Sequence, residues 1–426
     1  MSNYDVVVLG GGPAGLAAAL ASHGKGMNTL IIEREHRLGG ILKQCIHDGF
    51  GLVRFKEKLT GPEYAHRFIE QVQAQDIPVL LNTYVVQVDK SEAGFELTVV
   101  NRQNGIEKIE AKALIMATGC RERTARQVFI NGTRPAGVYT AGTAQHLVNL
   151  EGYLPGKKCV ILGSGDIGLI MARRLTLEGA QVLGVYEAKS TPSGLSRNIV
   201  QCLHDFNIPL HLSTTITRVF GDDRVEAVEI AQVDENMRPI AGTEQVIECD
   251  TVILSVGLIP ENEIAEMLGI QMDAATRGPV VDQHFMTSVP GVFSCGNSLH
   301  VNDLVDYVSE SGEIAGASAA QYVRETRVRE LVEIKKDNQD FLYVVPQHIN
   351  INTSNQQVIL YFRSRDIQEN MRVTIKSGDN VLFSRKYVIL RPPEMERVRF
   401  QLKGDIPAGR PIEITMEPAE DKGVAQ

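Results

Sequence analysis

A glycine-rich pattern that binds phosphate occurs twice in this chain and constrains its fold more than any other feature. In the first copy, the strand pattern DVVVL at residues 5–9 leads into Gly10, Gly12 and Gly15, a helical run follows, and a second apolar run ends at Glu33. This order of strand, tight turn, helix, strand and acid is the context in which G-x-G-x-x-G binds a dinucleotide. The glycines allow the turn, the approach of a pyrophosphate and the packing of helix on strand, and the acid accepts ribose hydroxyls. We call this turn with its acid the first cradle.

The second cradle repeats the pattern further along the chain. Residues 159–162 form an apolar run, Gly163, Gly165 and Gly168 have the same spacing, and a later apolar run ends at Glu187. An acid at that position accepts a ribose diol and repels a 2′-phosphate, so the sequence predicts a preference for NAD(H) over NADP(H).

The second turn also contains Asp166, which is unusual because a carboxylate beside a pyrophosphate weakens binding of the nucleotide. A vestigial or repurposed second site, on a chain that is a nucleotide-bound scaffold rather than a catalyst, therefore stays open as an alternative.

Composition agrees with a globular protein of several domains. The chain has 426 residues, of which 43% are hydrophobic and 22% charged, and a formal net charge of −9. The acidic balance gives no indication of a nucleic-acid surface. No apolar run reaches the roughly 18 residues that span a bilayer, and the first residues lead straight into a strand. We therefore expect neither a transmembrane segment nor a signal peptide.

The six cysteines are scattered, and no two of them form C-x-x-C. This argues against a disulfide framework, a zinc site or an iron–sulfur cluster, so we expect no metal. Most should be buried thiols in a reducing compartment, which predicts a cytoplasmic location. They are Cys45, Cys120, Cys159, Cys202, Cys249 and Cys295.

Three further stretches resemble the motifs of one superfamily. Residues 114–119 read LIMATG, residues 252–260 read VILSVGLIP, and residues 289–297 read VPGVFSCGN. Together with the two cradles they follow the order found in two-dinucleotide-binding flavoproteins of the glutathione-reductase type. The resemblance covers residues 1–325.

This resemblance implies an α/β fold with two Rossmann-like three-layer dinucleotide-binding domains. The NAD(H)-binding domain (153–258) is expected to be inserted in the FAD-binding domain (1–152 and 259–325). After the last motif, a helix N-terminus should point toward the flavin.

The resemblance also implies FAD and NAD(H) as cofactors, and it assigns cofactor contacts to the residues that match the family's motifs. These residues are Gly10, Gly12, Pro13, Ala14, Gly15, Glu33, Arg34, Gly40, Val86, Ala117, Thr118, Gly119, Gly163, Gly165, Asp166, Ile167, Gly168, Glu187, Val256, Gly257, Gly296 and Asn297. The family usually has aspartate at the last position. Asn297 can still hydrogen-bond the ribityl chain or a phosphate, but it carries no charge.

Cys45 and His47 lie in the segment GGILKQCIHDGFG, which resembles the part of the superfamily that runs beside the flavin. They are candidates for a nucleophile and its base, half of a redox disulfide, metal ligands, or neither. The disulfide reductases need a second cysteine here and a late H-x-x-x-x-E pair, and the sequence has neither. A single-cysteine cycle, as in NADH peroxidases and oxidases, needs an activated thiol. The alternative is that Cys45 packs against the flavin without reacting and that His47 is structural.

His300 is the third candidate for a catalytic residue. It follows Gly296 in the stretch LHVNDLVD (299–306), which should reach the flavin, and general acid–base chemistry is a possible role. The alternative is a helix start with Asn302 or Asp303 as the N-cap.

Three segments together look like a narrower subgroup. They are GGILKQCIHDGFG, FKEKLTGPEYA (55–65) and CGNSLHVNDLVD (295–306). The subgroup consists of FAD/NAD-linked oxidoreductases that accompany a glycerol-3-phosphate dehydrogenase-type FAD enzyme and often a small cysteine-rich protein. It includes subunits of hydrogen cyanide synthase, opine oxidases and archaeal dye-linked proline dehydrogenase. The resemblance implies an oligomeric complex in which this chain exchanges a hydride with NAD(H) and electrons with a partner. A stand-alone NADH oxidase or peroxidase that uses Cys45 is the alternative enzyme.

The last quarter of the chain has a different pattern. Residues 326–336 are rich in charge and predict a helical linker. Beyond them, in residues 337–426, six short runs separated by turn signals predict a small antiparallel β-sandwich. We interpret this sandwich as an interaction or oligomerisation domain. The alternative is a structural lid on the rest of the protein. The runs are 341–345, 358–362, 372–376, 381–388, 397–401 and 412–416. The final residues, 417–426, are predicted to be disordered.

Overall fold

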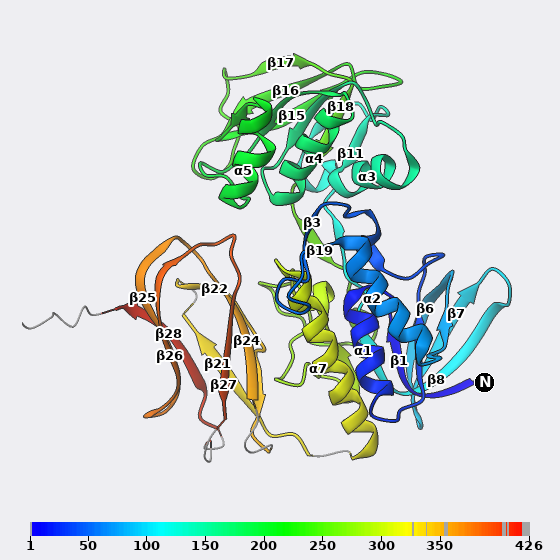
Figure 1. Ribbon diagram of the computed structural model, residues 1–426. Coiled ribbons are helices and arrows are strands. Elements are labelled where there is room, and N and C mark those ends of the chain that lie inside the picture. Colours follow the sequence, from blue (N-terminus) through cyan, green and yellow to red (C-terminus); the bar gives the residue numbers. More distant parts are fainter. Residues whose placement is uncertain are drawn as a thin grey trace, which may run out of the picture. The chain divides into compact units, whose positions relative to one another are not determined.

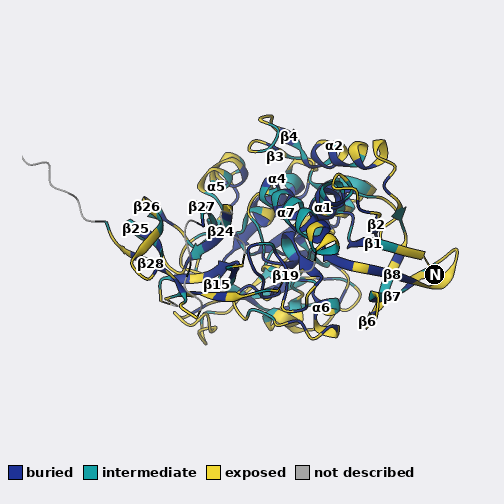
Figure 2. Cartoon of the chain, turned by 90° about the horizontal axis from the view of Figure 1, so that it is seen from below, coloured by how far each residue is buried: buried dark blue, intermediate teal, exposed yellow. Residues whose placement is uncertain are grey.

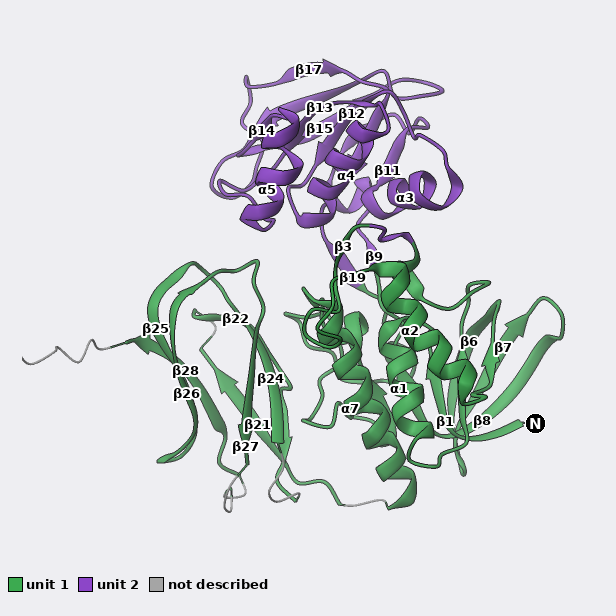
Figure 3. Cartoon of the chain, in the orientation of Figure 1, with its two compact units in different colours: residues 1–43, 47–120, 260–426 green, residues 44–46, 121–259 purple. Residues whose placement is uncertain are grey.

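A computed structural model describes residues 2–325, 328–337, 339–352, 357–402, 406 and 409–419. The chain forms two compact units (Figure 3). Unit 1 consists of residues 1–43, 47–120 and 260–426, and unit 2 consists of residues 44–46 and 121–259. In the described part of the chain, no helix combines the length and the apolar composition that crossing a bilayer requires.

Unit 1 begins with a mixed, mainly parallel sheet whose central strand β1 leads into the first cradle (Figure 1). Residues 6–9 of β1 are buried, as expected for a strand covered on both faces. The sheet order is β5-β2-β1-β8-β7-β6, with β20 beside β8, and β6, β7 and β8 pair antiparallel. The strands are β1 (Ser2–Leu9), β2 (Thr29–Ile32), β5 (Val79–Leu80), β6 (Thr83–Ser91), β7 (Gly94–Asn101), β8 (Gly105–Met116) and β20 (Val292–Ser294).

Helices cover this sheet, and two of them pack unusually closely. In α7 (Val305–Arg324), a Cβ at Gly312 or Gly316 would lie 2.1 Å from a backbone oxygen of α1 (Pro13–His23), so glycine permits the contact. Helix α2 (Gly61–Ala74) starts with a capping box and turns one exposed face outward, seen in yellow in Figure 2. The remaining elements here are η1 (Gly40–Gln44), β3 (Asp48–Phe50), β4 (Leu59–Thr60), α6 (Glu263–Met267) and η5 (Gly296–Ser298).

Unit 2 contains a second parallel sheet, in the order β11-β18-β12-β13-β14, and a smaller sheet, β10-β15-β16-β17. The chain passes between the units through β9 (Cys120–Glu122) and β19 (Leu258–Pro260). The strands are β10 (Asn131–Gly132), β11 (Val138–Thr140), β12 (Lys158–Leu162), β13 (Gln181–Tyr186), β14 (Leu210–His211), β15 (Thr214–Phe220), β16 (Ala227–Gln232), β17 (Gln245–Glu248) and β18 (Thr251–Leu254). The helices are η2 (Ala125–Val128), α3 (Ala141–His146), η3 (Leu147–Glu151), α4 (Asp166–Leu177), α5 (Ser196–Cys202) and η4 (His204–Phe206).

Unit 2 is larger than the inserted domain expected over residues 153–258. It also takes in residues 121–152, because β11 pairs with β18 in the parallel sheet and thereby joins that segment to it. Residues 44–46 belong to unit 2 as well, held by hydrogen bonds from Gln44 to Gly142 and Gln145.

The C-terminal part of unit 1 is a β-sandwich. Its two sheets have the orders β23-β21-β28-β25-β26 and β22-β24-β27. All six predicted strands are present, and one additional pair, β21 with β28, is parallel rather than antiparallel. The strands are β21 (Leu331–Lys336), β22 (Phe341–Val345), β23 (His348–Asn350), β24 (Gln357–Ser364), β25 (Gln368–Ser377), β26 (Asn380–Leu390), β27 (Glu396–Gln401) and β28 (Ile412–Pro418).

The helical linker expected over residues 326–336 is wrong where the structure describes it. Residues 331–336 form strand β21, because Val332 and Ile334 alternate with polar residues and bury their side chains in the sandwich core. Residues 326 and 327 lie outside the described residues, as do residues 420–426 of the predicted disordered end.

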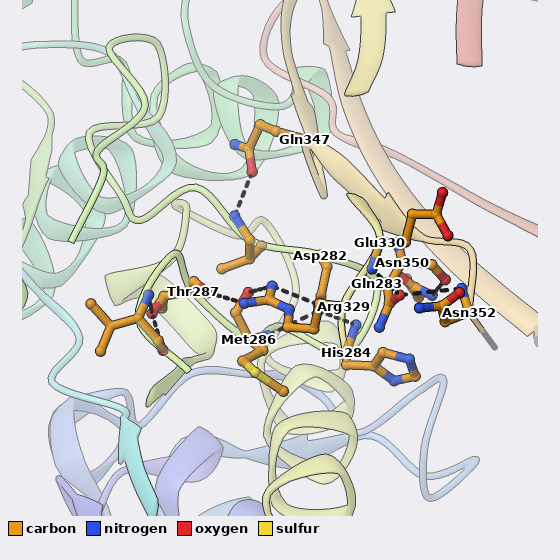
Figure 4. A network of polar contacts seen from close by, with 12 residues as sticks. Asp282, Gln283, His284, Met286, Thr287, Arg329, Glu330, Gln347, Asn350 and Asn352 are labelled. Carbon is orange, nitrogen blue, oxygen red and sulfur yellow. Dashed lines mark hydrogen bonds and ion pairs between the residues drawn. The ribbon is translucent and has the colours of Figure 1, made fainter. Parts of the chain in front are cut away.

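A buried polar network attaches the sandwich to the rest of unit 1 (Figure 4). The Asp282 carboxylate, fully buried, pairs with Arg329 (Oδ2 to Nη2, 2.8 Å). Gln283 and Asn350 exchange two hydrogen bonds, from Gln283 Nε2 to the Asn350 oxygen (2.9 Å) and from the Asn350 N–H to Gln283 Oε1 (2.7 Å). A second ion pair joins Glu310 of α7 to Arg397 of β27. These contacts make the sandwich a fixed part of unit 1.

Candidate cofactor site

The first cradle has the tight geometry that its glycines predict. Gly10 has φ +109°, and a Cβ there would lie 2.4 Å from the Ala117 oxygen. A Cβ at Gly15 would lie 1.8 Å from the Gly10 oxygen. Because only glycine fits at either position, the turn packs in direct contact with the start of α1.

The acid of the first cradle is held in place by backbone N–H groups. Glu33 is 6% exposed; its Oε2 accepts the Gly11 N–H (2.7 Å) and its Oε1 accepts the Glu35 N–H (2.8 Å). Each carboxylate oxygen can accept a further hydrogen bond, which is what a ribose diol requires.

The backbone around Gly12 is suited to a pyrophosphate. Gly40 has φ +56°, and a Cβ there would lie 3.0 Å from the Gly12 Cα, so the two glycines face each other closely. Pro13 and Ala14 open α1, whose first N–H groups have no acceptor within the helix and can bind an anion. These residues fit FAD in the manner that the sequence predicts.

The predicted contacts beyond the turn lie on neighbouring strand ends. Ala117, Thr118 and Gly119 follow β8, where Thr118 Oγ1 donates to the Glu261 oxygen (2.6 Å). Arg34 pairs with the Glu261 carboxylate (Nη1 to Oε2, 2.8 Å), an interaction that sequence reasoning missed. Val86, which the sequence also predicts as a cofactor contact, is an exposed residue of β6.

Both the oxygen and the nitrogen of the Asn297 side-chain amide form hydrogen bonds within unit 1. Its Oδ1 accepts the Asn302 N–H (3.0 Å), and its Nδ2 donates to Cys120 Sγ (3.6 Å). An ionised aspartate could not donate to Cys120 Sγ, which gives asparagine a structural reason here. The preceding Gly296 donates its N–H to Ser311 Oγ of α7 (2.8 Å), a contact that the sequence pattern did not indicate.

His300 lies under the β-sandwich and is 1% exposed. Its ring packs against Tyr361 and Tyr343, with centroids 5.1 and 5.7 Å away. Burial and the nearby Arg363 charge lower the pKa of His300 to about 3. These surroundings favour a neutral packed ring over an acid–base group, and the catalytic role stays a prediction.

The alternative helix start is wrong. The N-cap of α7 is Leu304, and Asp303 instead accepts the Met395 N–H (2.6 Å) and pairs with Arg363. Asp303 therefore fixes the segment after Gly296 to the sandwich rather than capping the helix.

Cys45 and His47 lie in different units and are described separately. In unit 2, Cys45 Sγ lies 3.8 Å from Gln145 Oε1, and burial raises the pKa of the thiol to about 12. A reactive cysteine needs the opposite shift. In unit 1, half-buried His47 has its Nδ1 3.2 Å from the Asp48 oxygen and its ring 5.0 Å from that of Phe50.

The second cradle repeats the geometry of the first. Cβ atoms at Gly163 and Gly168 would lie 2.0 Å from the Ser255 oxygen and 2.5 Å from the Gly163 oxygen. A Cβ at Gly165 would meet nothing within 4 Å, which leaves open space above the backbone where a pyrophosphate would approach. Val256 and Gly257 follow directly after Ser255, at the carboxyl end of β18.

The acid of the second cradle is held by the same pair of backbone donors. Glu187 is 7% exposed; its Oε2 accepts the Ser164 N–H (3.1 Å) and its Oε1 accepts the Lys189 N–H (3.1 Å). The two carboxylates are thus anchored alike at equivalent positions of two sheets.

Two hydrogen-bond donors explain why an aspartate, Asp166, is present in the turn. Its Oδ1 accepts the Leu195 N–H (2.9 Å) and an N–H of the Asn198 amide (2.7 Å). The carboxylate therefore holds the segment that follows β13, while the next residue, Ile167, lies partly exposed in the first turn of α4. Ser193 and Asn198 were not predicted, because no spacing rule relates them to the turn.

Comparison with known proteins agrees with this geometry. Residues 4–321 match the family model described as pyridine nucleotide-disulphide oxidoreductase. The chain belongs to this family of FAD-dependent pyridine nucleotide oxidoreductases, and it is an oxidoreductase.

Among curated proteins, it is 26% identical over 341 residues to the hydrogen cyanide synthase subunit HcnB of Pseudomonas protegens, a match that covers 75% of this chain and 68% of HcnB. It is 25% identical over 303 residues to ferredoxin–NADP reductase 3 of Lysinibacillus sphaericus, covering 70% and 82%. Among solved structures, thioredoxin reductase of T. acidophilum superposes with a TM-score of 0.61 at 24% identity, covering 76% of this chain and all of the other, and shows the same fold.

Proposed function

We propose that this chain is the NAD(H)-linked flavoprotein subunit of a larger oxidoreductase complex. The observation that carries the proposal is the pair of cradles, each with an acid anchored by the second residue of its turn and by the residue two positions after the acid. FAD, when bound, takes up two electrons as a hydride and releases them singly or as a pair. The protein residues bind and orient the cofactors.

The nucleotide preference rests on Glu187. Its buried carboxylate favours a ribose diol and repels a 2′-phosphate, which supports NAD(H) over NADP(H). The similarity to a ferredoxin–NADP reductase points the other way, and so does Lys189, an exposed lysine two residues further on. We give more weight to Glu187 because its charge is fixed in the cradle itself.

A partner protein supplies or receives the electrons in this proposal. Support comes from the similarity to HcnB, which is named as a subunit of hydrogen cyanide synthase. By the subgroup resemblance, the partner is an FAD-dependent dehydrogenase of the glycerol-3-phosphate dehydrogenase type, with a small cysteine-rich protein as a further candidate. The raised pKa of Cys45 gives no support to a stand-alone peroxidase. The cytoplasmic location stays a prediction.

An anaerobic titration of the purified chain, followed by its visible spectrum, tests the proposal. We expect a flavin band that stoichiometric NADH bleaches and that NADPH bleaches much less. A spectrum with bound flavin that neither nucleotide bleaches would contradict the nicotinamide site and favour a scaffold. Cys45→Ser separates the peroxidase alternative: peroxide turnover by NADH should collapse if the thiol reacts, and dye reduction should persist in either case.

A further inference from the structure

Serine hydroxyls around Glu187 distinguish the second cradle from the first. Besides the Ser164 N–H, Glu187 Oε2 accepts hydrogen bonds from Ser164 Oγ (2.6 Å) and Ser193 Oγ (3.1 Å). In the first cradle the residue equivalent to Ser164 is Gly11, which has no side chain to donate. Glu187 Oε2 therefore has three donors, which fill the acceptor capacity of a carboxylate oxygen.

Ser193 is itself fixed at two places. Its N–H donates to Ser164 Oγ (2.9 Å), so the two serines and Glu187 form a closed set of hydrogen bonds. Two residues later, the Leu195 N–H donates to Asp166 of the turn (2.9 Å). Moving the Ser193 loop away from the carboxylate would therefore break its hydrogen bonds to both Ser164 and Asp166.

This anchoring bears on the choice of nucleotide. Lys189 is exposed beside Glu187, and an ammonium at that place would pair with a 2′-phosphate if the carboxylate turned away. While Glu187 is held by the serines, its negative charge stays at the position of the ribose diol. The choice between the two nucleotides then depends on how firmly the carboxylate is held.

We propose that Ser193 is a positioning residue that sets the preference for NAD(H) by holding the Glu187 carboxylate toward the ribose. The inference rests on the proposed binding of NAD(H) at the second cradle. It concerns the adenosine half of the nucleotide and leaves hydride transfer unaffected.

The test uses the FAD-loaded full chain and two probes that lack the nicotinamide ring, ADP-ribose and 2′-phospho-ADP-ribose. Binding is measured by calorimetry for the wild type, Ser193→Ala, Ser193→Thr and Ser190→Ala. Because Ser193→Ala removes a hydrogen bond to a charged carboxylate, it should reduce the affinity ratio of the two probes by roughly tenfold or more. Ser193→Thr keeps a hydroxyl and should retain most of the ratio. Ser190→Ala, an exposed serine of the same loop, should leave it unchanged.

Kinetics give a second readout. With NADH and NADPH as donors to a dye, Ser193→Ala should change the ratio of kcat/KM through KM, with kcat for NADH unchanged. A probe ratio for Ser193→Ala equal to that of Ser190→Ala would overturn the inference.

Glu187→Gln separates this failure from failure of the proposed function. If it abolishes the wild-type preference for ADP-ribose while Ser193→Ala does not, the function stands and the inference is wrong. If the wild type binds neither probe and NADH does not reduce its flavin, both the proposed function and this inference are wrong.

Discussion

The Asp282–Arg329 ion pair allows a quantitative prediction about the attachment of the β-sandwich. Removing the charge of Arg329, as in Arg329→Met, leaves a fully buried carboxylate without its counter-ion. Breaking a buried ion pair in this way costs about 3–5 kcal/mol. Asp282 Oδ1 keeps two backbone donors, the N–H groups of His284 (2.9 Å) and Met286 (3.2 Å). We therefore expect the lower end of that range, about 3 kcal/mol.

Asp282→Asn should cost less. Arg329 is 14% exposed and keeps the Thr287 oxygen as an acceptor for Nη1 (2.8 Å), so its charge is not left without partners. We expect a loss of about 1–2 kcal/mol from the weaker hydrogen bonds of the amide. In the double variant the two losses should fall short of additivity, with a coupling of about 1–2 kcal/mol.

Native-state hydrogen exchange is the suitable assay, because a chain with two units need not unfold in one step. The amides to follow are those of His284 and Met286, which donate to the Asp282 carboxylate. Lys108→Met is the control, since Lys108 forms an exposed pair with Glu96 in the same unit and should change little. Equal protection of the two amides in Arg329→Met and in the control would refute the reasoning.

Two further predictions concern the cradle and the thiol. Gly15→Ala should prevent FAD from being retained on purification, because its Cβ would lie 1.8 Å from the Gly10 oxygen. The control Gly24→Ala should retain FAD, because Gly24 has an ordinary φ of −60°. Equal flavin content in the two variants would contradict the packing argument. Alkylation of Cys45 by iodoacetamide, followed by mass spectrometry, should be slow at pH 8 and still accelerate above pH 10, because a thiol with a pKa of about 12 is neutral throughout that range. A rate that levels off near pH 8 would show an activated thiolate instead.

Local patterns predicted the elements that local interactions decide. Both cradles, and strands such as β2 and β13 that end at their acids, follow from glycine spacing and apolar runs that are buried on both faces. The strand at 331–336 could not be predicted in this way. Its charges are equally compatible with a solvated helix, and its identity depends on pairing with β28, about eighty residues away in the sequence.

The candidate catalytic residues show the same limit. His300 was placed by its distance from Gly296, but its burial depends on Tyr343 and Tyr361, which belong to the sandwich. Cys45 was recognised as the one cysteine of its motif, but its raised pKa reflects burial beside Gln145. A motif identifies the residue, whereas its protonation state depends on neighbours that are distant in sequence.

The two cradles also show how one scaffold can serve two kinds of ligand. In the first, a Cβ at Gly11 would lie 2.4 Å from the Leu38 side chain and 3.0 Å from Glu33 Oε2, so no hydroxyl can be introduced there and the carboxylate keeps its free acceptor sites for a diol. In the second, Ser164 and Ser193 occupy acceptor sites of Glu187. A diol at Glu187 therefore binds through Oε1, which has a single protein donor, and it finds fewer open acceptor sites there than at Glu33. This difference accords with a resident cofactor in the first cradle and an exchanging nucleotide in the second, as the proposed function requires.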